Sequence, residues 1–235
     1  FGPENITDYE IGYKSQWQVG DTRGLFEVSV YRDEYEDIQR TISVVGEDNL
    51  NLVDVTSNAA RARIQGADIS AMARFNRAFN LSGSVSYTDA KYLDYPNTGQ
   101  ITGVPIDFDL TSSMFANVSE WTANLSPSLQ INGLNPELPD VRLSATVSYR
   151  DEYANAEPNV GIFPRTILPS RTIVNLRADW QDVNDLPVDL SVGVLNATDE
   201  TGPLGVVDQT RSNTGYFYQI NRQPRSYYVQ LNYTF

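Results

Sequence analysis

The sequence predicts an all-β fold: a transmembrane, antiparallel, up-and-down β-barrel to which this chain contributes about nine strands. Apolar and polar residues alternate in one segment after another, and tyrosine or tryptophan stands at the ends of many apolar stripes. Short connections also alternate with long ones. Each of these features is typical of a barrel whose outer face meets lipid and whose inner face meets water.

The expected strands show an alternation with period two, which puts successive side chains on opposite faces. In the last and clearest of them, one face carries Tyr227, Val229, Leu231, Tyr233 and Phe235. In chain order, the strands are expected at residues 9–17, 26–30, 67–75, 79–87, 121–131, 141–150, 174–181, 188–194 and 225–235.

The connections between these strands follow a rule. Short ones are expected at residues 20–24, at 76–78, around Gly133 and Pro136, and at 184–187. Long ones are expected at 36–57, 93–118, 154–170 and 198–221. Outer-membrane barrels have short periplasmic turns and longer extracellular loops. We therefore expect the long loops outside the cell, the first strand running inward, and the C-terminus in the periplasm.

Composition excludes several kinds of chemistry. The 235 residues include no cysteine and no histidine, which rules out disulfides, Cys-rich zinc sites and histidine-dependent catalysis within this chain. A net charge of -13 argues against nucleic acid as a partner. No run approaches the roughly 18 consecutive apolar residues of a membrane helix. We predict no enzyme, no catalytic residue, no cofactor and no metal site.

A soluble β-sandwich is the alternative fold, because its strands alternate too. The polar face argues against it, since Ser, Thr, Asn, Gln and oppositely charged side chains suit a wet lumen. An odd number of strands cannot close an all-antiparallel barrel, because the first and last would be parallel neighbours. An open edge in lipid would leave backbone groups unsatisfied. Further strands are therefore expected from elsewhere.

Four groups of short motifs stand in order along the chain. They are Gly2-Pro3-Glu4 with Tyr9-Glu10-Ile11-Gly12-Tyr13-Lys14, Asn58-Ala59-Ala60 with Gly66-Ala67-Asp68, Leu195-Asn196-Ala197-Thr198-Asp199, and Pro224-Arg225-Ser226-Tyr227-Tyr228 with Phe235. Together they resemble the C-terminal part of TonB-dependent outer-membrane receptors, with Asp68 where that family usually has Glu.

The resemblance implies a barrel of about 22 strands with a plugged lumen, of which residues 1–235 form the C-terminal portion. The plug domain and TonB box are expected outside this chain, which is either a fragment or one half of a receptor split between two polypeptides. The implied function is TonB-dependent uptake of a scarce large nutrient, such as a siderophore, cobalamin or an oligosaccharide. The alternative is an outer-membrane barrel subunit that scaffolds a complex and transports nothing.

The resemblance also implies partners in the bacterial outer membrane. They are the rest of the barrel and the plug, the TonB complex acting through the plug, and outer-membrane lipid and lipopolysaccharide. The barrel-assembly machinery is expected to read the C-terminal strand through Tyr227, Val229, Leu231, Tyr233 and Phe235.

Loop residues are the candidates for ligand contact, because external loops carry recognition and aromatic rings stack on sugars or siderophores. They are Tyr92, Tyr95, Arg211, Tyr216 and Tyr218, of which the aromatic ones could equally be girdle residues at the membrane interface. The acidic residues match no calcium-loop spacing and are expected where a strand meets a solvated loop; they are Asp33, Glu34, Glu36 and Asp37, with Glu47 and Asp48 further on. Arg225, beside Pro224, is expected to have a structural role where the last strand begins.

Overall fold

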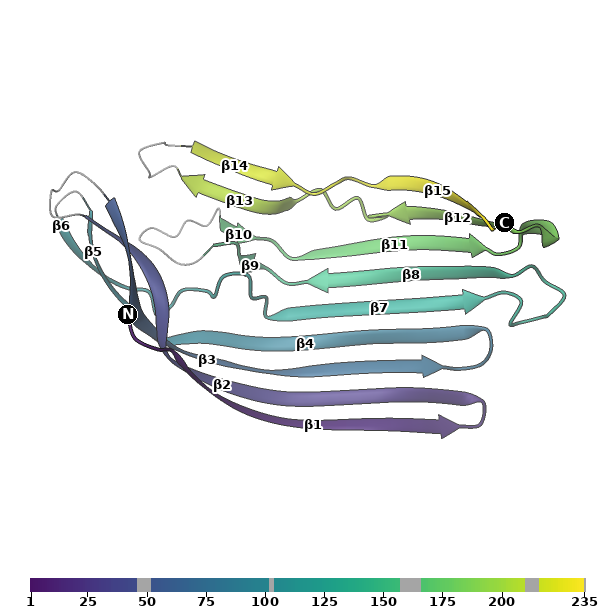
Figure 1. Cartoon of the computed structure of the whole chain (residues 1–235), viewed down its shortest axis with the longest axis horizontal. Coiled ribbons are helices and arrows are strands. Elements are labelled where there is room, and N and C mark those ends of the chain that lie inside the picture. The colour runs from purple at the N-terminus through teal and green to yellow at the C-terminus, as the bar shows by residue number, and fades with distance from the viewer. Residues whose placement is uncertain (46–51, 102–103, 157–165, 210–215, 235) are drawn as a thin grey trace.

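A single antiparallel sheet is the main element of the computed structural model, which describes residues 1–45, 52–101, 104–156, 166–209 and 216–234. Nine strands form it in the order β1-β2-β3-β4-β7-β8-β11-β12-β15 (Figure 1). They are β1 (Asn5–Val19), β2 (Thr22–Val45), β3 (Leu52–Arg74), β4 (Phe79–Asp94), β7 (Trp121–Gln130), β8 (Val141–Arg150), β11 (Arg171–Trp180), β12 (Val188–Leu195) and β15 (Ser226–Tyr233). The predicted all-β, up-and-down fold is confirmed.

Short turns lie at one end of the sheet and long connections at the other (Figure 1). Three long connections form two-stranded hairpins: β5 (Pro96–Ile101) with β6 (Val104–Asp109), β9 (Tyr153–Ala154) with β10 (Ile167–Leu168), and β13 (Pro203–Gln209) with β14 (Tyr216–Asn221). The short β11–β12 connection contains a 3-10 helix, η2 (Val183–Asp185). The predicted alternation of short and long connections is confirmed, although the sequence did not predict the hairpins.

The first long connection differs from the prediction, because most of the expected loop is strand. β2 and β3 stay paired as far as Val45 and Leu52. Their register shifts between Tyr35 and Ile38, and Asp37 between them has a φ of 57°. A bulge inserts an extra residue and bends the strand. It therefore interrupts the alternation by which a strand is recognised in sequence.

Local chemistry explains two of the short turns. Gly20 has a φ of 58° between β1 and β2, a left-handed conformation that glycine adopts without steric cost. Between β3 and β4, the side chain of Asn76 accepts hydrogen bonds from the backbone amides of Ala78 at 2.7 Å and Phe79 at 2.8 Å. Asparagine is favoured in turns because it can bond to the backbone that follows it.

The two faces of the sheet differ in chemistry. Large apolar side chains are exposed on one face, including Ile11 at 76 % and Val19 at 72 % in β1 and Val229 at 73 % in β15. A soluble sandwich would bury such side chains, whereas contiguous exposed apolar surface marks contact with a membrane or a partner. This face therefore matches the outer surface of a membrane barrel.

Buried apolar side chains gather at the long-connection end. One cluster joins β2, β3 and β4 to the β4–β7 connection through Ile38, Ala60, Ala62, Tyr92, Tyr95, Leu110 and Phe115. A smaller cluster joins the next two long connections through Tyr153, Leu168 and Val206. These connections are therefore packed structures, held by side chains that are far apart in sequence.

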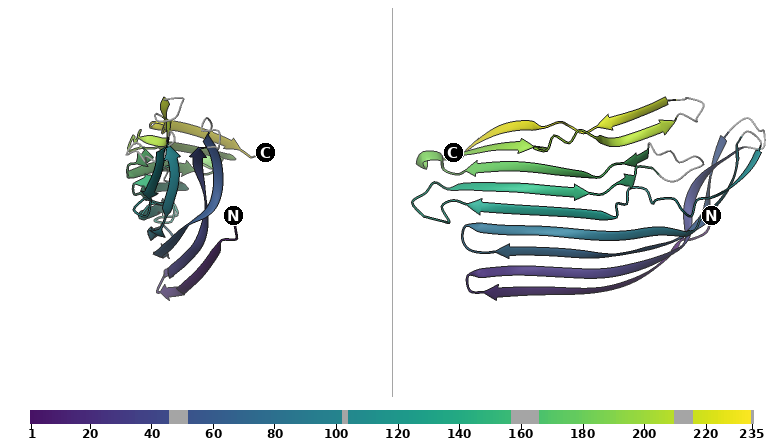
Figure 2. Two further views of the ribbon diagram at one scale, coloured as in Figure 1. Left: turned by 90° about the vertical axis from the view of Figure 1, so that its left-hand side faces the viewer. Right: turned by 180° about the vertical axis from the view of Figure 1, so that it is seen from behind.

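The sheet is curved and open, with its first and last strands apart (Figure 2). Within the described part of the chain, β1 pairs with β2 alone and β15 pairs with β12 alone. Exposed strand edges are not tolerated in lipid, because their backbone groups would lack hydrogen-bond partners. Both edges thus require neighbouring strands from outside the nine-stranded sheet. No helix among the described residues is long and apolar enough to cross a membrane.

Candidate functional site

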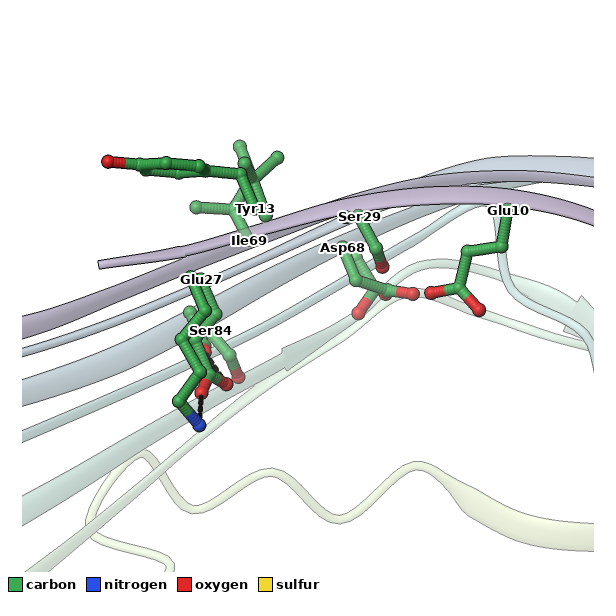
Figure 3. Close-up of a pocket in the computed structure, with 12 residues that line it drawn as sticks. Glu10, Tyr13, Glu27, Ser29, Asp68, Ile69 and Ser84 are labelled. Carbon is green, nitrogen blue, oxygen red and sulfur yellow. Dashed lines mark hydrogen bonds and ion pairs between the residues drawn. The ribbon is translucent and has the colours of Figure 1, made fainter. Parts of the chain in front are cut away.

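The polar face of β1–β4 contains a hollow of ≈ 400 Å³ (Figure 3). Strand register builds it, since Ser29 lies opposite Gly12 on one side and Asp68 on the other. The side chains of Glu10, Glu27 and Asp68 point to the hollow's side of the sheet, whereas Tyr13 and Ile69 point to the opposite side (Figure 3). Alternation therefore separates a hydrophilic inner surface from the apolar outer one.

Charges in this inner hollow are partly paired. The Lys14 ammonium forms an ion pair with the carboxylate of Glu27, to which the Ser70 hydroxyl also donates a hydrogen bond of 3.4 Å. Such an exposed pair contributes about 0–1 kcal/mol to stability. Glu10 and Asp68 add two more carboxylates to the lining. The hollow therefore presents hydroxyls and negative charge, which suit a hydrated lumen wall.

Among the residues that the structure describes, no three Asp, Glu, His or Cys side chains lie close enough together to hold an ion. The acidic residues from Asp33 to Asp37 lie in β2 itself, a correction to the expected boundary between strand and loop. Glu47 and Asp48 lie outside the described residues. Asp33 lies opposite Asp8 in the register of β1 and β2, and Glu34 forms an ion pair of 2.6 Å with Arg32. Strand pairing beyond the expected boundary accounts for the difference.

Tyr92 and Tyr95, two of the expected ligand contacts, are only 3 % and 2 % exposed. The Tyr92 ring stacks on Phe115 with centroids 4.1 Å apart, and its centroid is 4.8 Å from that of Tyr95. Arg40 donates a hydrogen bond of 3.0 Å to the Tyr92 hydroxyl. The β4–β7 connection covers these rings, so the structure gives this pair a packing role. Ligand contact by Tyr92 and Tyr95 stays a prediction.

Tyr216 and Tyr218 lie on one face of β14 and are 46 % and 48 % exposed. Their rings are stacked, with centroids 5.9 Å apart and planes at 15°. Two parallel exposed rings form a surface on which a planar or ring-shaped group can pack. Arg211 lies outside the described residues. Ligand contact by the two tyrosines stays a prediction.

The closing strand presents its apolar side chains outward. In β15, Tyr227, Val229, Leu231 and Tyr233 are 72 %, 73 %, 66 % and 60 % exposed. Phe235 lies outside the described residues. The four exposed side chains share one face, as the period-two pattern requires. Recognition of this strand by the assembly machinery stays a prediction.

A polar link at the start of β15 was not foreseen, although its residues belong to the motifs noted in the sequence. Asn196 is 6 % exposed, and its amide nitrogen donates hydrogen bonds to the backbone carbonyls of Glu200 at 2.9 Å and Gln223 at 3.0 Å. The Asp199 carboxylate accepts a bond of 2.9 Å from the backbone amide of Arg225. Arg225 therefore has a structural contact through its backbone.

A second polar link joins the N-terminal segment to β2 and β3. The Asn58 carboxamide bonds to both backbone groups of Gly2 and donates to the carbonyl of Asp37 at 2.7 Å. The Glu4 carboxylate accepts from the Tyr35 hydroxyl at 2.7 Å and from the backbone amide of Gln39. These contacts hold the bulged part of β2 to the start of the chain. The only sequence signal for them is the presence of Asn58 and Glu4 in separate motifs.

An apolar outer face, a polar inner face and alternating connections define this chain as part of the wall of an outer-membrane β-barrel. The chain belongs to the family of TonB-dependent receptor-like β-barrels, whose model matches residues 1–197. The family resemblance noted in the sequence is confirmed.

Solved receptors have a similar fold. They include the ferric-catecholate import receptor Fiu from E. coli K12 (17 % identity, TM-score 0.66), the siderophore receptor PiuA from Acinetobacter baumannii (17 %, 0.67) and the ferric yersiniabactin uptake receptor FyuA from Yersinia pestis (14 %, 0.67). The matches cover 98 %, 96 % and 97 % of this chain but 27 %, 28 % and 29 % of those receptors. The chain thus spans less than a third of their length, and identities this low show the fold alone. No curated protein matches the chain in sequence.

Proposed function

We propose that this chain forms part of the barrel of a receptor that imports a scarce, large nutrient across the bacterial outer membrane with energy delivered by TonB. The observation that carries the proposal is the division of the nine-stranded sheet into an exposed apolar face and a polar, hydroxyl-rich inner face. A lipid-embedded wall with a wet interior is what a large hydrophilic solute needs for passage.

A metal chelate, and first of all a ferric siderophore, is the substrate class we favour over cobalamin or an oligosaccharide. Structural relatives support this choice, because the three named above are a ferric-catecholate import receptor, a siderophore receptor and a ferric yersiniabactin uptake receptor. In this chain, Tyr216 and Tyr218 are the candidate ligand contacts, since their stacked rings are exposed on β14. Arg211 remains a candidate from its place in the sequence.

The orientation follows from the connections. We infer that the long-connection end is extracellular and that the short turns and the C-terminus are periplasmic, because outer-membrane barrels keep their short turns on the periplasmic side. The proposed partners are the remaining barrel strands and plug at the edges and inner face, lipid and lipopolysaccharide at the apolar face, TonB through the plug, and the assembly machinery at β15.

Uptake of radiolabelled iron by cells that express the intact receptor tests this function. A panel of ferric siderophores should include at least one that accumulates in these cells, but neither in cells that lack the receptor gene nor in cells that lack TonB. Cobalamin and a labelled oligosaccharide are run beside the panel to test the substrate class. A receptor deletion that disturbs a surface complex but changes no uptake would instead establish the scaffold function.

A further inference from the structure

A second hollow on the inner face is basic, in contrast to the first. It measures ≈ 320 Å³ and lies where β3, β4, β7 and β8 meet the short turns. Three arginines line it, namely Arg74, Arg77 and Arg142, and we call it the basic hollow. Asp140 is the one carboxylate among the described residues of its lining. The pattern could not be seen in the sequence, where the three arginines belong to separate segments.

Strand register places this hollow on the lumenal side. Asn80, which lines it, lies opposite Ser128, and Gln130 lies opposite Arg142. Asn80 shares its face of β4 with Ser84, which lines the first hollow, because residues two or four apart point the same way. The basic hollow therefore faces the barrel interior, and its occupant must come from there.

Neutral groups hold the arginines in place. Arg74 donates a hydrogen bond of 3.3 Å to the backbone carbonyl of Asn76, and Arg142 donates one of 3.1 Å to the side-chain oxygen of Gln130. The Gln130 amide in turn donates to the carboxylate of Asp140. Neither bond to arginine neutralises its charge. These contacts orient two guanidinium groups. The carboxylate of Asp179 in β11 lies opposite Arg142, but it forms an ion pair of 2.7 Å with Arg177.

The third arginine is positioned by its backbone. Gly133 lies so close to the Arg77 backbone that a Cβ at Gly133 would be 2.6 Å from the Arg77 carbonyl oxygen. The β7–β8 connection therefore packs on the β3–β4 turn and fixes the place of Arg77. Its side chain is exposed at the rim of the hollow.

The basic hollow is positively charged, although the whole chain has a net charge of -13. Three guanidinium groups and one carboxylate leave an excess of two positive charges among the described lining residues. A concave surface lined by one sign of charge concentrates its field and attracts the opposite charge. Arginine also binds carboxylates through two parallel hydrogen bonds.

We propose that the basic hollow docks an acidic segment of the plug domain, with two or more Asp or Glu side chains facing Arg74, Arg77 and Arg142. The inference rests on the proposed function in one respect, the presence of a plug in the lumen. A polypeptide is favoured over lipid because the hollow opens on the inner face, away from the exposed apolar side chains.

Photo-crosslinking in the intact receptor identifies the occupant. A p-benzoylphenylalanine replaces Asn132, which lines the hollow, and a matched control carries it at Glu137, exposed on the same connection. We expect a cross-link from position 132 to a plug peptide rich in Asp and Glu, and no such cross-link from position 137. A cross-link to a neutral or basic plug peptide, or to phospholipid or lipopolysaccharide, would overturn the proposal.

Charge reversal supplies a second, independent test. In detergent micelles at low ionic strength, the intact receptor with R74E, R77E and R142E should lose its plug to added protease roughly tenfold faster than wild type. The matched variant with R74K, R77K and R142K keeps the charge and should stay within about twofold of wild type. High salt should reduce the difference, because it screens the pairs. Equal cleavage of the Glu and Lys variants would refute electrostatic docking.

Uptake separates this inference from the proposed function. If wild-type cells import iron and the Glu variant retains its plug, docking by the basic hollow is wrong but the receptor function stands. If the Glu variant releases its plug and no substrate is imported by wild type, docking stands and the function is wrong. Migration of unheated samples on denaturing gels reports whether each barrel is folded.

Discussion

The backbone amide of Arg225 donates a hydrogen bond of 2.9 Å to the carboxylate of Asp199, across 26 positions of sequence. Asp199 is the last residue of the motif Leu195-Asn196-Ala197-Thr198-Asp199. It has a φ of 56°, a left-handed conformation that Asp and Asn tolerate better than other side chains. Arg225 stands immediately before β15. One carboxylate therefore ties the start of the long β12–β15 connection to the start of the closing strand.

Asp199→Ala should lower the free energy of unfolding of the intact receptor by about 1.5 kcal/mol, because it removes this bond and places alanine at a left-handed position. Asp199→Asn keeps both the acceptor and the tolerated conformation, so it should stay close to wild type. Urea unfolding in lipid vesicles, followed by tryptophan fluorescence, measures both. Equal losses in the two variants would contradict the assigned role.

Asn196→Ala should be more damaging than Asp199→Ala, with a loss of about 3 kcal/mol. Asn196 is buried, and its side chain satisfies the carbonyls of Glu200 and Gln223 as well as the amide of Glu200. Truncation leaves these part-buried backbone groups without their partners, and an unsatisfied buried group costs roughly 1–3 kcal/mol. Asn196→Asp retains the acceptor but loses the donor, so an intermediate value is expected in the same unfolding experiment.

Gly66→Ala should destabilise the barrel by about 1–3 kcal/mol through overpacking. A Cβ at Gly66 would lie 2.2 Å from the Tyr87 carbonyl oxygen and 2.6 Å from the Tyr31 hydroxyl. Gly12 is the matched control, since a Cβ there finds its nearest neighbour at 3.6 Å. Heat-dependent gel migration of the two variants compares them, and a Gly12→Ala barrel as unstable as Gly66→Ala would contradict the explanation.

The contacts of Glu4 should make stability depend on pH. Hydrogen bonds from the Gln39 amide and the Tyr35 hydroxyl hold the pKa of the Glu4 carboxyl below its ordinary 4.5. A lowered pKa means that the stabilisation is full above pH 4.5 and is lost as pH falls through the folded value.

Glu4→Gln should remove this part of the pH dependence. The drop in urea midpoint between pH 7 and the acid range should be smaller in the variant than in wild type. Glu137→Gln is the control. Because Glu137 is exposed on a short turn, this variant should show the same pH dependence of the urea midpoint as wild type. If Glu4→Gln showed the same pH dependence as wild type, titration of Glu4 would not contribute to stability.

The two exposed tyrosines of β14 provide the functional prediction. The double variant Tyr216→Ala with Tyr218→Ala should need a substrate concentration roughly 2–10-fold higher for half-maximal uptake. The reason is that an aromatic pair contributes about 0.5–1.5 kcal/mol beyond area burial. Barrel stability should not change, because both rings are about half exposed. Phe217→Ala, on the other face of the hairpin, is the control. Normal uptake by the double variant would remove the tyrosines from the ligand site.

Period-two alternation was sufficient to predict the strands of the main sheet. In β15, the alternation from Tyr227 to Tyr233 identified both the strand and its outer face, and the structure agrees. The prediction failed at Asp37, where a bulge shifts the phase and hides the continuation of β2. Once a bulge breaks the alternation, the sequence pattern no longer shows that the two strands stay paired beyond it.

The candidate site was less predictable than the fold. Tyr92 and Tyr95 were placed in a loop, but their burial depends on Ile38, Ala60 and Phe115, which come from other parts of the chain. The exposure of Tyr216 and Tyr218 agreed with their expected place in a long connection. Aromatic residues look alike in sequence whether a neighbouring segment covers them or not.

By itself, the sequence determined which residues face lipid, which face the lumen, and where turns alternate with long connections, because alternation and turn chemistry act over a few neighbouring residues. Only the tertiary structure decided which distant residues meet. Register across β3, β4, β7 and β8 brings Arg74, Arg77 and Arg142 to one hollow, and the fold of the connections brings Asp199 to Arg225. Such contacts depend on how whole strands align, which no single segment encodes.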